Sequence, residues 1–355
     1  MNGFSIKDKV VVLRFSRLGR IPPAQYAVEL LHENHVPVEV VEFGADNEQT
    51  EWLPGPPAKR RLRSTPLPWI NQGLRTLLDG LLVLLRLLLW ISKEGKPKLI
   101  YAHGLYEQWV ANLVFRLVEV PYAVAVHEVY EPDDLSLLNR IFLSGEKQAL
   151  REAQFLTFPE PSRAEYYQRR YALKNKIYVV FNCPRRLRKE MASLRSTWSV
   201  PPGHRVVGYL GGIGRENYLR EAVEAVLGLT GVHFLYWGWG DEEYLQELKR
   251  AAGPASDRIR WMGVAGEEKW AVLKGWDLGL CLYRPDLLRL KMAATASNKM
   301  FECLSVGVPV LTTNAPDFKK FLEENPVGYS AIDVSVGGIR RAIESAQKKY
   351  MRPGH

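Results

Sequence analysis

Short runs of consecutive apolar residues alternate along the chain with longer segments in which apolar residues recur at helical spacing. In the first half, the runs VVVL, VPVEVV, KLIY and YAVAV are rich in β-branched residues, as buried strands are. FLTF and KIYVV predict two further short strands. Strands that alternate with amphipathic helices predict a parallel sheet covered by helices on both faces.

The second half repeats this alternation. HRVVGYLGGIG, VHFLYWGWG, RIRWMG and LGLCLYRP each predict a strand, and the first two end in a glycine loop. The stretch RRLRKEMASLRSTWSVPPG between the halves is basic and irregular, which indicates an interdomain connection. The sequence therefore predicts an α/β protein with two Rossmann-like domains, residues 1–184 and 203–332, and a terminal helix within residues 333–355.

Length and charge narrow the class of protein. A chain of 355 residues is longer than a domain with a single hydrophobic core usually is, which agrees with two domains. Lys and Arg number 48 against 39 Asp and Glu, and this net charge of +9 favours an anionic partner such as a phosphorylated substrate or anionic lipid. The basic residues are scattered among loops without a recognition motif, so we expect no nucleic-acid partner.

Cysteine usage and the N-terminus indicate the compartment. Cys183, Cys281 and Cys303 are odd in number and widely spaced, which fits a reducing compartment and argues against a disulfide framework or a structural zinc site. The chain runs from its N-terminus directly into a strand pattern, and no signal peptide is visible. We therefore expect a cytoplasmic location.

Candidate chemistry follows from a rule of open parallel sheets, in which ligands bind beyond the carboxyl ends of the strands. The rule selects glycine loops and two histidines: Gly19, His103, His127, Gly211, Gly212, Gly214, Gly238, Gly240 and Gly263. Glycine loops let backbone N–H groups approach a phosphate, although tight turns and close packing also require glycine. No acidic residue closes the strand after the GGIG loop, so a dinucleotide site is disfavoured.

The segment ASNKMFECLSVGVPVLTT predicts a short helix with Ser297 as its N-cap and Gly307 at its end. Asn298, Lys299 and Glu302 share one face of this helix. A phosphate at the helix tip and a ribose diol at Glu302 would suit that order of residues. The alternative is an exposed Lys299–Glu302 ion pair without function.

These residues together resemble a known family. The stretch LIYAHGLYEQWVANLVFRLVEVPYAVAVHEVYE, the strand IYVVFNCP, the loop GGIGREN, the segment RIRWMGVAGEEKW and the helix SNKMFECLSVGVPVLTT occur in the order found in GT-B glycosyltransferases. The resemblance is to the large, retaining, family 4-like class that builds bacterial polysaccharides and glycolipids, and it covers about residues 10–332. It implies two Rossmann-like domains facing a cleft, with the terminal helix packing back toward the first domain.

The resemblance also implies roles for the two domains. The first would bind a hydroxyl acceptor, with Gly19 and His103 on the acceptor side and His127 as the catalytic residue beside the donor sugar. The second would bind a nucleotide-sugar donor, UDP first and GDP as the alternative, with Glu302 on the ribose and Val264 near the base. The remaining donor contacts would be Gly212, Arg215, Arg220, Gly238, Ser297, Asn298 and Lys299.

Departures from the family pattern leave alternatives open. The second acid that the family often carries eight residues before Glu302 is replaced by Ala294, and Gly19 is followed by Arg20 instead of another glycine. No DxD triplet occurs, so we expect neither a metal nor another cofactor. A sugar-nucleotide epimerase and a non-catalytic nucleotide-sugar-binding protein remain alternatives to a transferase.

A last segment bears on the acceptor. The segment from Leu74 to Ser92 is strongly apolar but interrupted by charged residues, which favours a helix packed on the domain over a helix that spans a membrane. Leucines nevertheless run nearly all round this helix, and a proline-rich loop with cations from Lys59 to Arg63 precedes it. Such a pair suits peripheral contact with an anionic membrane and a lipid-linked acceptor.

Overall fold

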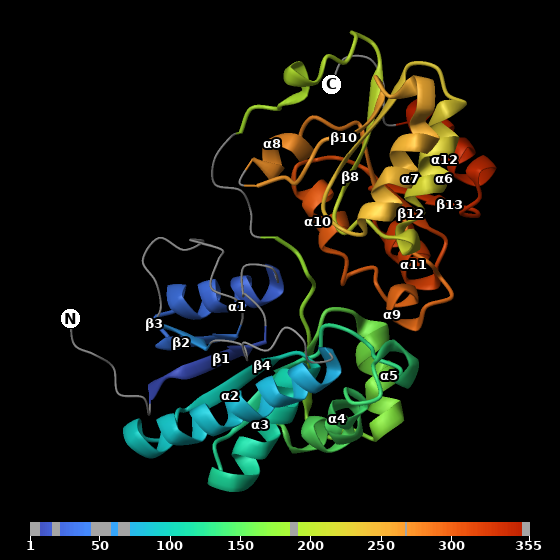
Figure 1. The fold of residues 1–355 in the computed structure, drawn as a ribbon. Helices are drawn as coiled ribbons and strands as arrows, with labels where there is room; N and C mark the ends of the chain where they lie inside the picture. The colour runs from blue at the N-terminus through green and yellow to red at the C-terminus, as the bar shows by residue number, and fades with distance from the viewer. Residues whose placement is uncertain are drawn as a thin grey trace. The chain divides into compact units, whose positions relative to one another are not determined.

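The computed structural model describes residues 8–15, 22–43, 58–62, 72–184, 191–266 and 268–349. It divides into two compact units, Met1–Asn182 and Cys183–His355. Each unit is built around one parallel sheet (Figure 1). The α/β architecture with two Rossmann-like domains, predicted from the alternation of apolar runs and amphipathic segments, is confirmed.

Unit 1 contains a seven-stranded sheet in the order β3-β2-β1-β4-β5-β6-β7, and every pairing in it is parallel. Its strands are β1 (Val10–Arg14), β2 (Val38–Phe43), β3 (Ala58–Leu62), β4 (Leu99–His103), β5 (Tyr122–Ala125), β6 (Phe155–Phe158) and β7 (Lys176–Val179). Its α-helices are α1 (Pro22–Glu33), α2 (Gln72–Glu94), α3 (Leu105–Val118), α4 (Arg140–Glu152) and α5 (Pro161–Tyr171). The strand order reverses between β1 and β4, so their carboxyl ends border the crevice where such sheets bind ligands.

The prediction of a loop before α2 was partly wrong. Residues 58–62 form the edge strand β3, which pairs with β2. An edge strand needs only backbone hydrogen bonds on one side and commonly carries charged residues. Apolar patterning therefore could not reveal it, and Arg63 lies outside the described residues.

Unit 2 contains a six-stranded parallel sheet in the order β10-β9-β8-β11-β12-β13. Its strands are β8 (Arg205–Leu210), β9 (Val232–Trp237), β10 (Ile259–Trp261), β11 (Leu278–Cys281), β12 (Val310–Thr313) and β13 (Gly328–Ala331). Its α-helices are α6 (Leu219–Leu227), α7 (Glu242–Ala252), α8 (Lys269–Leu273), α9 (Leu288–Lys291), α10 (Asn298–Ser305), α11 (Pro316–Glu324) and α12 (Val336–Lys349). The order reverses between β8 and β11, which repeats the arrangement of unit 1.

Helices cover both faces of the unit 2 sheet. The consecutive residues Val206 and Val207 are both fully buried, and they belong to different core clusters, because successive side chains of a strand point to opposite faces. One cluster includes residues of α6, α7 and α12, and the other includes residues of α8, α10 and α11. Gly279 lets α10 lie directly on β11, since a Cβ there would fall 2.5 Å from Cys303 Sγ.

The apolar face of the terminal helix α12 packs within unit 2. Ile339, Ile343 and Ala346 of α12 are fully buried in the core of unit 2, where the helix packs against α6 and β13. These three residues recur at a spacing of three to four and form one stripe. Because α6 and β13 already cover that stripe, α12 is an integral part of the second domain.

Candidate functional site

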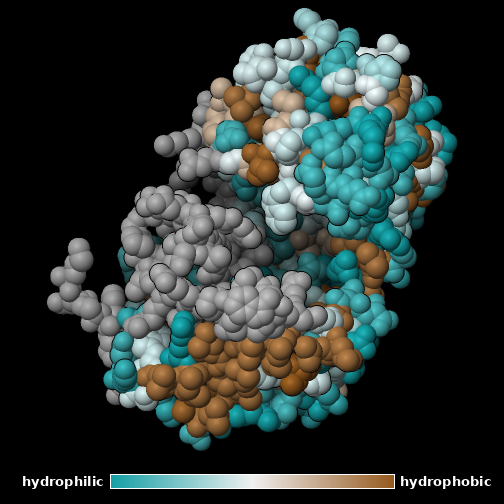
Figure 2. Space-filling view, viewed as in Figure 1, coloured by the Kyte–Doolittle hydropathy of each residue, from teal (hydrophilic) through white to brown (hydrophobic). Residues whose placement is uncertain are grey.

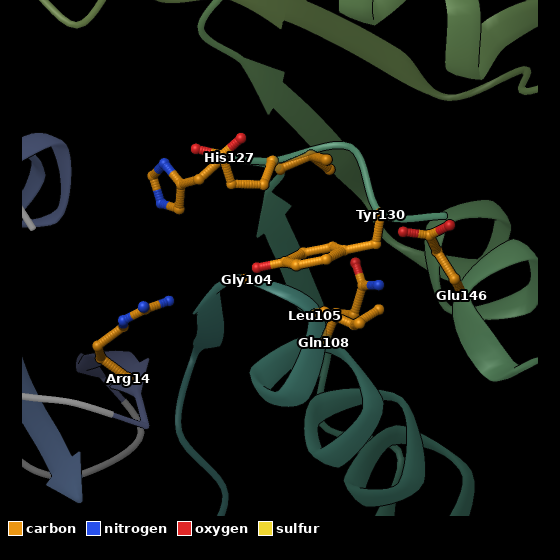
Figure 3. A pocket seen from close by; sticks show the side chains of 9 residues that line it. Arg14, Gly104, Leu105, Gln108, His127, Tyr130 and Glu146 are labelled. Atoms are coloured by element: carbon orange, nitrogen blue, oxygen red, sulfur yellow. The ribbon is translucent and has the colours of Figure 1, made fainter. Parts of the chain in front are cut away.

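In unit 1, a cavity of about 100 Å³ lies at the carboxyl ends of β1, β4 and β5 (Figure 3). The Tyr130 ring lies between the side chains of Arg14 and Glu146 in this view. The cavity is lined by Arg14, Gly104, Leu105, Gln108, Val126, His127, Glu128, Tyr130 and Glu146. Of the residues predicted for this domain, His127 lies on the cavity wall, and Gly19 lies outside the described residues.

The two predicted histidines contact each other. His103 ends β4, and His127 follows β5, the neighbouring strand in the sheet. Nδ1 of His103 lies 3.0 Å from Nε2 of His127, and the rings stack with centroids 5.2 Å apart. Burial lowers the pKa of His127 to about 3, and the Arg14 and Arg163 guanidinium groups add to the effect. Burial also holds the pKa of His103 well below its usual range, and electrostatic interactions with His127 and Arg14 lower it further. Both imidazoles are therefore neutral at pH 7.

Arg14 and Glu107 form an ion pair beside these histidines. The Arg14 guanidinium lies 3.1 Å from Glu107 Oε1 and also donates to the carbonyl oxygen of His103. The same carboxylate oxygen accepts a 2.6 Å hydrogen bond from the Phe15 N–H. Gly104 has a φ of 125°, and a Cβ there would lie 2.7 Å from Arg14 Nη1 and 2.8 Å from Glu107 Oε2. The glycine is therefore required for the ion pair to approach the backbone.

Sequence reasoning did not identify Arg14 or Glu107 as site residues. Arg14 ends a buried strand and Glu107 lies in the first turn of a helix. These positions are also common for surface charges, so the pattern alone carried no signal. Burial raises the pKa of Glu107, although Arg14 opposes this effect.

The other side of the cavity is polar and acidic. Glu146 is buried and accepts hydrogen bonds from the hydroxyls of Tyr171 at 2.7 Å and Tyr167 at 3.0 Å. Burial raises the pKa of Glu146. Glu128 adds a second carboxylate to the lining and lies 3.5 Å from Arg163. Because Arg14 is already paired with Glu107, the cavity suits an uncharged group with hydroxyls better than an anion.

In unit 2, the predicted helix is α10, and its N-cap is confirmed. Ser297 Oγ accepts a 3.2 Å hydrogen bond from the Met300 N–H and lies 2.7 Å from the Tyr283 hydroxyl. Asn298 begins the helix, and its Oδ1 is buried without a hydrogen-bond partner among the described residues. The tip of α10 therefore combines a fixed cap with an unused polar atom.

Lys299 points away from Glu302. Its Nζ donates to Asn217 Oδ1 at 2.8 Å and to the Tyr209 hydroxyl at 3.2 Å. The ammonium also lies 4.4 Å from the Tyr283 ring centroid and 4.6 Å from that of Tyr209. Burial lowers the pKa of Lys299 to about 8. The side chain is thus a confined cation behind the loop that follows β8.

Glu302 has a different partner from the one considered in the sequence. It is 5% exposed, and its Oε1 lies 2.9 Å from Nζ of Lys269 on α8. The alternative of an exposed Lys299–Glu302 pair is therefore wrong. Sequence reasoning did not identify Lys269, which is separated from Glu302 by 33 positions.

Arg215 and Arg220 share one carboxylate partner, Glu247. Both donate to Glu247 at 2.7 Å, and Arg220 also donates to Glu224 at 2.8 Å. Arg215 lies over the Tyr244 ring with 63% of its side chain exposed. The short helical turn Arg215–Asn217 therefore presents Arg215 to Glu247 and Asn217 to Lys299.

The glycine loops pack on each other. Gly238 has a φ of 144°, and a Cβ there would lie 1.8 Å from the carbonyl oxygen of Gly211. A Cβ at Gly240 would lie 2.0 Å from the carbonyl oxygen of Ile213. Close approach of two loops therefore explains these glycines. The packing of a strand against a helix, which we considered from the sequence, does not. At Gly212, by contrast, a Cβ would meet nothing within 4 Å.

The residue predicted near the nucleotide base follows the neighbouring strand. Val264 follows β10 after Met262 and Gly263 and is 59% exposed. Because β10, β9 and β8 are adjacent in the sheet, this residue and the two glycine loops lie along one edge. The predicted donor residues of unit 2 thus follow the carboxyl ends of its strands or lie in the first turns of the helices after them, with Glu302 one turn into α10.

Two family models match the chain. The model of the glycosyl transferase 4-like domain matches residues 23–183, and the model of glycosyl transferases group 1 matches residues 204–346. The chain belongs to the family 4-like glycosyltransferases. This confirms the resemblance to family 4-like glycosyltransferases, and the matched ranges correspond closely to the two units of the structure.

Solved structures show that the glycosyltransferase has the GT-B fold. Sucrose-phosphate synthase from Thermosynechococcus elongatus is 16% identical to this chain, with a TM-score of 0.74. The match covers 97% of this chain and 90% of the synthase. WaaG, a glycosyltransferase involved in lipopolysaccharide biosynthesis, is 14% identical with a TM-score of 0.68, covering 96% and 90%. HepE from Anabaena, solved with UDP and glucose, is 13% identical with a TM-score of 0.66, covering 96% and 95%.

UDP-N-acetylglucosamine 2-epimerases also share the fold, among them the enzyme from Methanocaldococcus jannaschii, 16% identical with a TM-score of 0.62 over 96% of this chain and 94% of its own. No curated protein matches the sequence closely enough to add to these comparisons. At such identities the solved structures establish the fold alone. The transferase assignment rests on the two family models.

Ala294 marks where this glycosyltransferase departs from the resemblance. Its side chain is 1% exposed and belongs to the apolar core cluster of α10 and α11. An acid at this position would need a polar partner to offset its burial. The site thus offers no carboxylate at Ala294.

Proposed function

We propose that the glycosyltransferase moves a sugar from a nucleoside diphosphate sugar, with UDP first and GDP as the alternative, to a hydroxyl acceptor. The observation that carries this proposal is the arrangement at α10. A buried, partnered carboxylate at Glu302 stands one turn behind a capped helix tip with the confined cation of Lys299 nearby. The HepE structure with UDP and glucose supports the choice of UDP.

Each donor residue has a role in this proposal. Glu302 accepts hydrogen bonds from the ribose hydroxyls, and Lys269, 2.9 Å away, holds its carboxylate in place. The backbone N–H groups of Ser297 and Asn298 and the Lys299 ammonium meet the diphosphate, since the positive end of a helix favours an anion. The open face of Gly212 and the Gly238 loop allow the phosphates to come close, and Val264 lies against the base.

The proposed roles of Arg215 and Arg220 require an exchange of partners. Both side chains hold Glu247, and both are well exposed. An exposed ion pair is worth about 0–1 kcal/mol, so a diphosphate could replace this carboxylate at little cost. The two arginines would then stabilise the charge that develops on the leaving diphosphate.

The acceptor side of the proposal rests on the cavity of unit 1. Its lining combines hydroxyl, amide, imidazole and carboxylate groups, which are the usual partners of sugar hydroxyls. We propose that His127 contacts the reacting sugar and that His103 supports it. Retention of configuration is a further proposal that follows from the family resemblance. Independence from metal ions is proposed from the absence of a DxD triplet, and a cytoplasmic location from the cysteine usage.

A lipid-linked acceptor and peripheral membrane contact complete the proposal. Leu81, Leu85 and Leu89 of α2 are 46%, 55% and 51% exposed, and their spacing of four places them on one stripe. Figure 2 shows an apolar patch on the face of unit 1 over this helix. Among the helices that the structure describes, none is long and apolar enough to cross a membrane. We propose that this stripe lies on the surface of an anionic membrane.

Calorimetric titration of the full chain with UDP, GDP, UDP-glucose and UDP-N-acetylglucosamine tests the donor. Binding of at least one of these with micromolar affinity is the expected result, and no binding by any nucleotide would refute the proposal. Incubation with UDP-N-acetylglucosamine without acceptor tests the epimerase alternative, because an epimerase yields an isomeric nucleotide sugar. A transferase yields at most slow release of UDP. Tight binding without turnover across donors and acceptors would favour the non-catalytic alternative that Ala294 raises.

A further inference from the structure

The contact between His103 and His127 determines where one hydrogen atom lies. At 3.0 Å, Nδ1 of His103 and Nε2 of His127 form a hydrogen bond, so one nitrogen donates and the other accepts. Since both imidazoles are neutral, each ring carries one N–H. Two arrangements satisfy these conditions, and they differ in which histidine donates.

The surroundings of His103 distinguish the two arrangements. His103 is 1% exposed, and its Nε2 has no hydrogen-bond partner among the residues that the structure describes. If His127 donated, the hydrogen of His103 would lie on this Nε2 as a buried N–H without a partner. If His103 donates, Nε2 carries only a lone pair. Orphaned buried N–H groups are rarer in proteins than unused acceptors, so the second arrangement is favoured.

We propose that His103 is a positioning residue that donates from Nδ1 to Nε2 of His127 and thereby holds the hydrogen of His127 on Nδ1. His127 then presents an N–H, without a free lone pair, to the substrate. It donates a hydrogen bond to an oxygen of the donor sugar or acceptor, and it does not remove a proton as a general base. The hydrogen position rests on unit 1 alone, whereas contact with a substrate rests on the proposed function.

Neighbouring residues hold the backbone of both histidines and pack against the His103 ring. Arg14 donates to the carbonyl oxygen of His103, and Arg163 donates to that of His127. The Tyr101 ring packs edge-on against His103 with centroids 4.4 Å apart, and its hydroxyl lies 2.8 Å from Thr157 Oγ1. These contacts hold the backbone at both histidines, and Tyr101 packs against the His103 ring, so the pair is positioned before substrate binds.

Long-range ¹H–¹⁵N correlation spectra of the full chain, labelled with [¹⁵N]histidine at pH 7.5, measure the hydrogen position. The chain has seven histidines, and the His127→Asn variant identifies the signals of His127. The expected result is a protonated Nδ1 and an unprotonated Nε2 for His127. A protonated Nε2, or exchange averaging over both nitrogens, would overturn the proposal.

Two variants of His103 separate positioning from a merely structural role. Asparagine retains an N–H near the position of Nδ1, whereas leucine fills a similar space without a donor. We expect His103→Asn to keep the hydrogen of His127 on Nδ1 and His103→Leu to shift it toward Nε2, which free histidine prefers. An unchanged tautomer in His103→Leu would contradict the assignment.

The effect on turnover is tested with UDP-glucose as the probe, by release of UDP without acceptor. His103→Leu should lower kcat about tenfold, the value of one hydrogen bond, with KM within about twofold and His103→Asn close to the parent. Equal loss in both variants would indicate a structural role. If the parent protein binds no nucleotide sugar, the proposed function fails while the tautomer measurement still stands.

Discussion

Replacement of Glu302 by alanine tests the donor site most directly. The side chain is 5% exposed and is bonded to Lys269 at 2.9 Å, so its carboxylate is fixed before a ligand arrives. A hydrogen bond to a charged group contributes about 1.5–3 kcal/mol, and a ribose diol offers two hydroxyls. Allowing for overlap between the two bonds, a loss of about 2–4 kcal/mol, or about 30- to 1,000-fold in Kd, is expected for UDP.

Loss of stability should not explain that result. The Lys269 side chain is 27% exposed, so water can solvate the ammonium group that Glu302→Ala leaves behind. We therefore expect a cost of about 1 kcal/mol to folding, far less than removal of a partner from a fully buried pair. Thermal unfolding of the two proteins without ligand provides this control.

Calorimetry with UDP and 2′,3′-dideoxy-UDP completes the experiment. If Glu302 binds the ribose diol, the parent protein should bind the dideoxy analogue as weakly as Glu302→Ala binds UDP. The variant should then no longer distinguish the two ligands. An unchanged affinity of Glu302→Ala for UDP would refute the assignment. So would a variant that loses as much affinity on removal of the two ribose hydroxyls as the parent protein does.

Three further predictions concern the loops, the cation and the membrane. Gly238→Ala should lower the free energy of unfolding by more than about 2 kcal/mol in chemical denaturation, because its Cβ would lie 1.8 Å from a carbonyl oxygen at a φ of 144°; an unchanged midpoint would contradict the loop–loop contact. Since the pKa of Lys299 is lowered to about 8, its charge is present below that pH. UDP affinity should therefore fall as pH rises through 8, and a Lys299→Met variant should lose this dependence; an equal dependence in both proteins would exclude the lysine. Leu85→Glu with Leu89→Glu should reduce flotation with anionic vesicles at least tenfold, since burial of each leucine contributes about 1.5–3 kcal/mol. Ile332→Glu, at a residue 82% exposed in unit 2, should have no such effect, and equal losses would argue against the leucine stripe.

The local features of the site could be predicted from the sequence. Ser297 is the N-cap of α10, and Gly307 follows the helix with a φ of 81°, as the residue types indicated. His103 and His127 stand at the ends of neighbouring strands. Each of these features depends on residues close in the chain, or on the rule that parallel strands end at one edge.

The partners of the charged residues could not be predicted in the same way. Lys299 and Glu302 are neighbours on the surface of an ideal helix, yet Lys299 bonds to Asn217 and Glu302 to Lys269, 82 and 33 positions away. A long side chain takes the partner that best compensates its burial, and burial is defined by distant elements. The ion pair of Arg14 and Glu107, separated by more than 90 residues, was missed for the same reason.

The sequence by itself determined that the chain has two Rossmann-like domains, and it determined the cap of α10 and the strand ends that carry the candidate residues. Periodicity and capping are local properties, and they survive in the one-dimensional pattern. The tertiary structure decided that α12 belongs to the second domain, that loop contact demands glycine at 238, and that Ala294 lies in an apolar core. It also placed His103 and His127 within hydrogen-bond distance of each other. These outcomes depend on which surfaces meet when the sheets and helices pack, and the order of residues alone does not specify that.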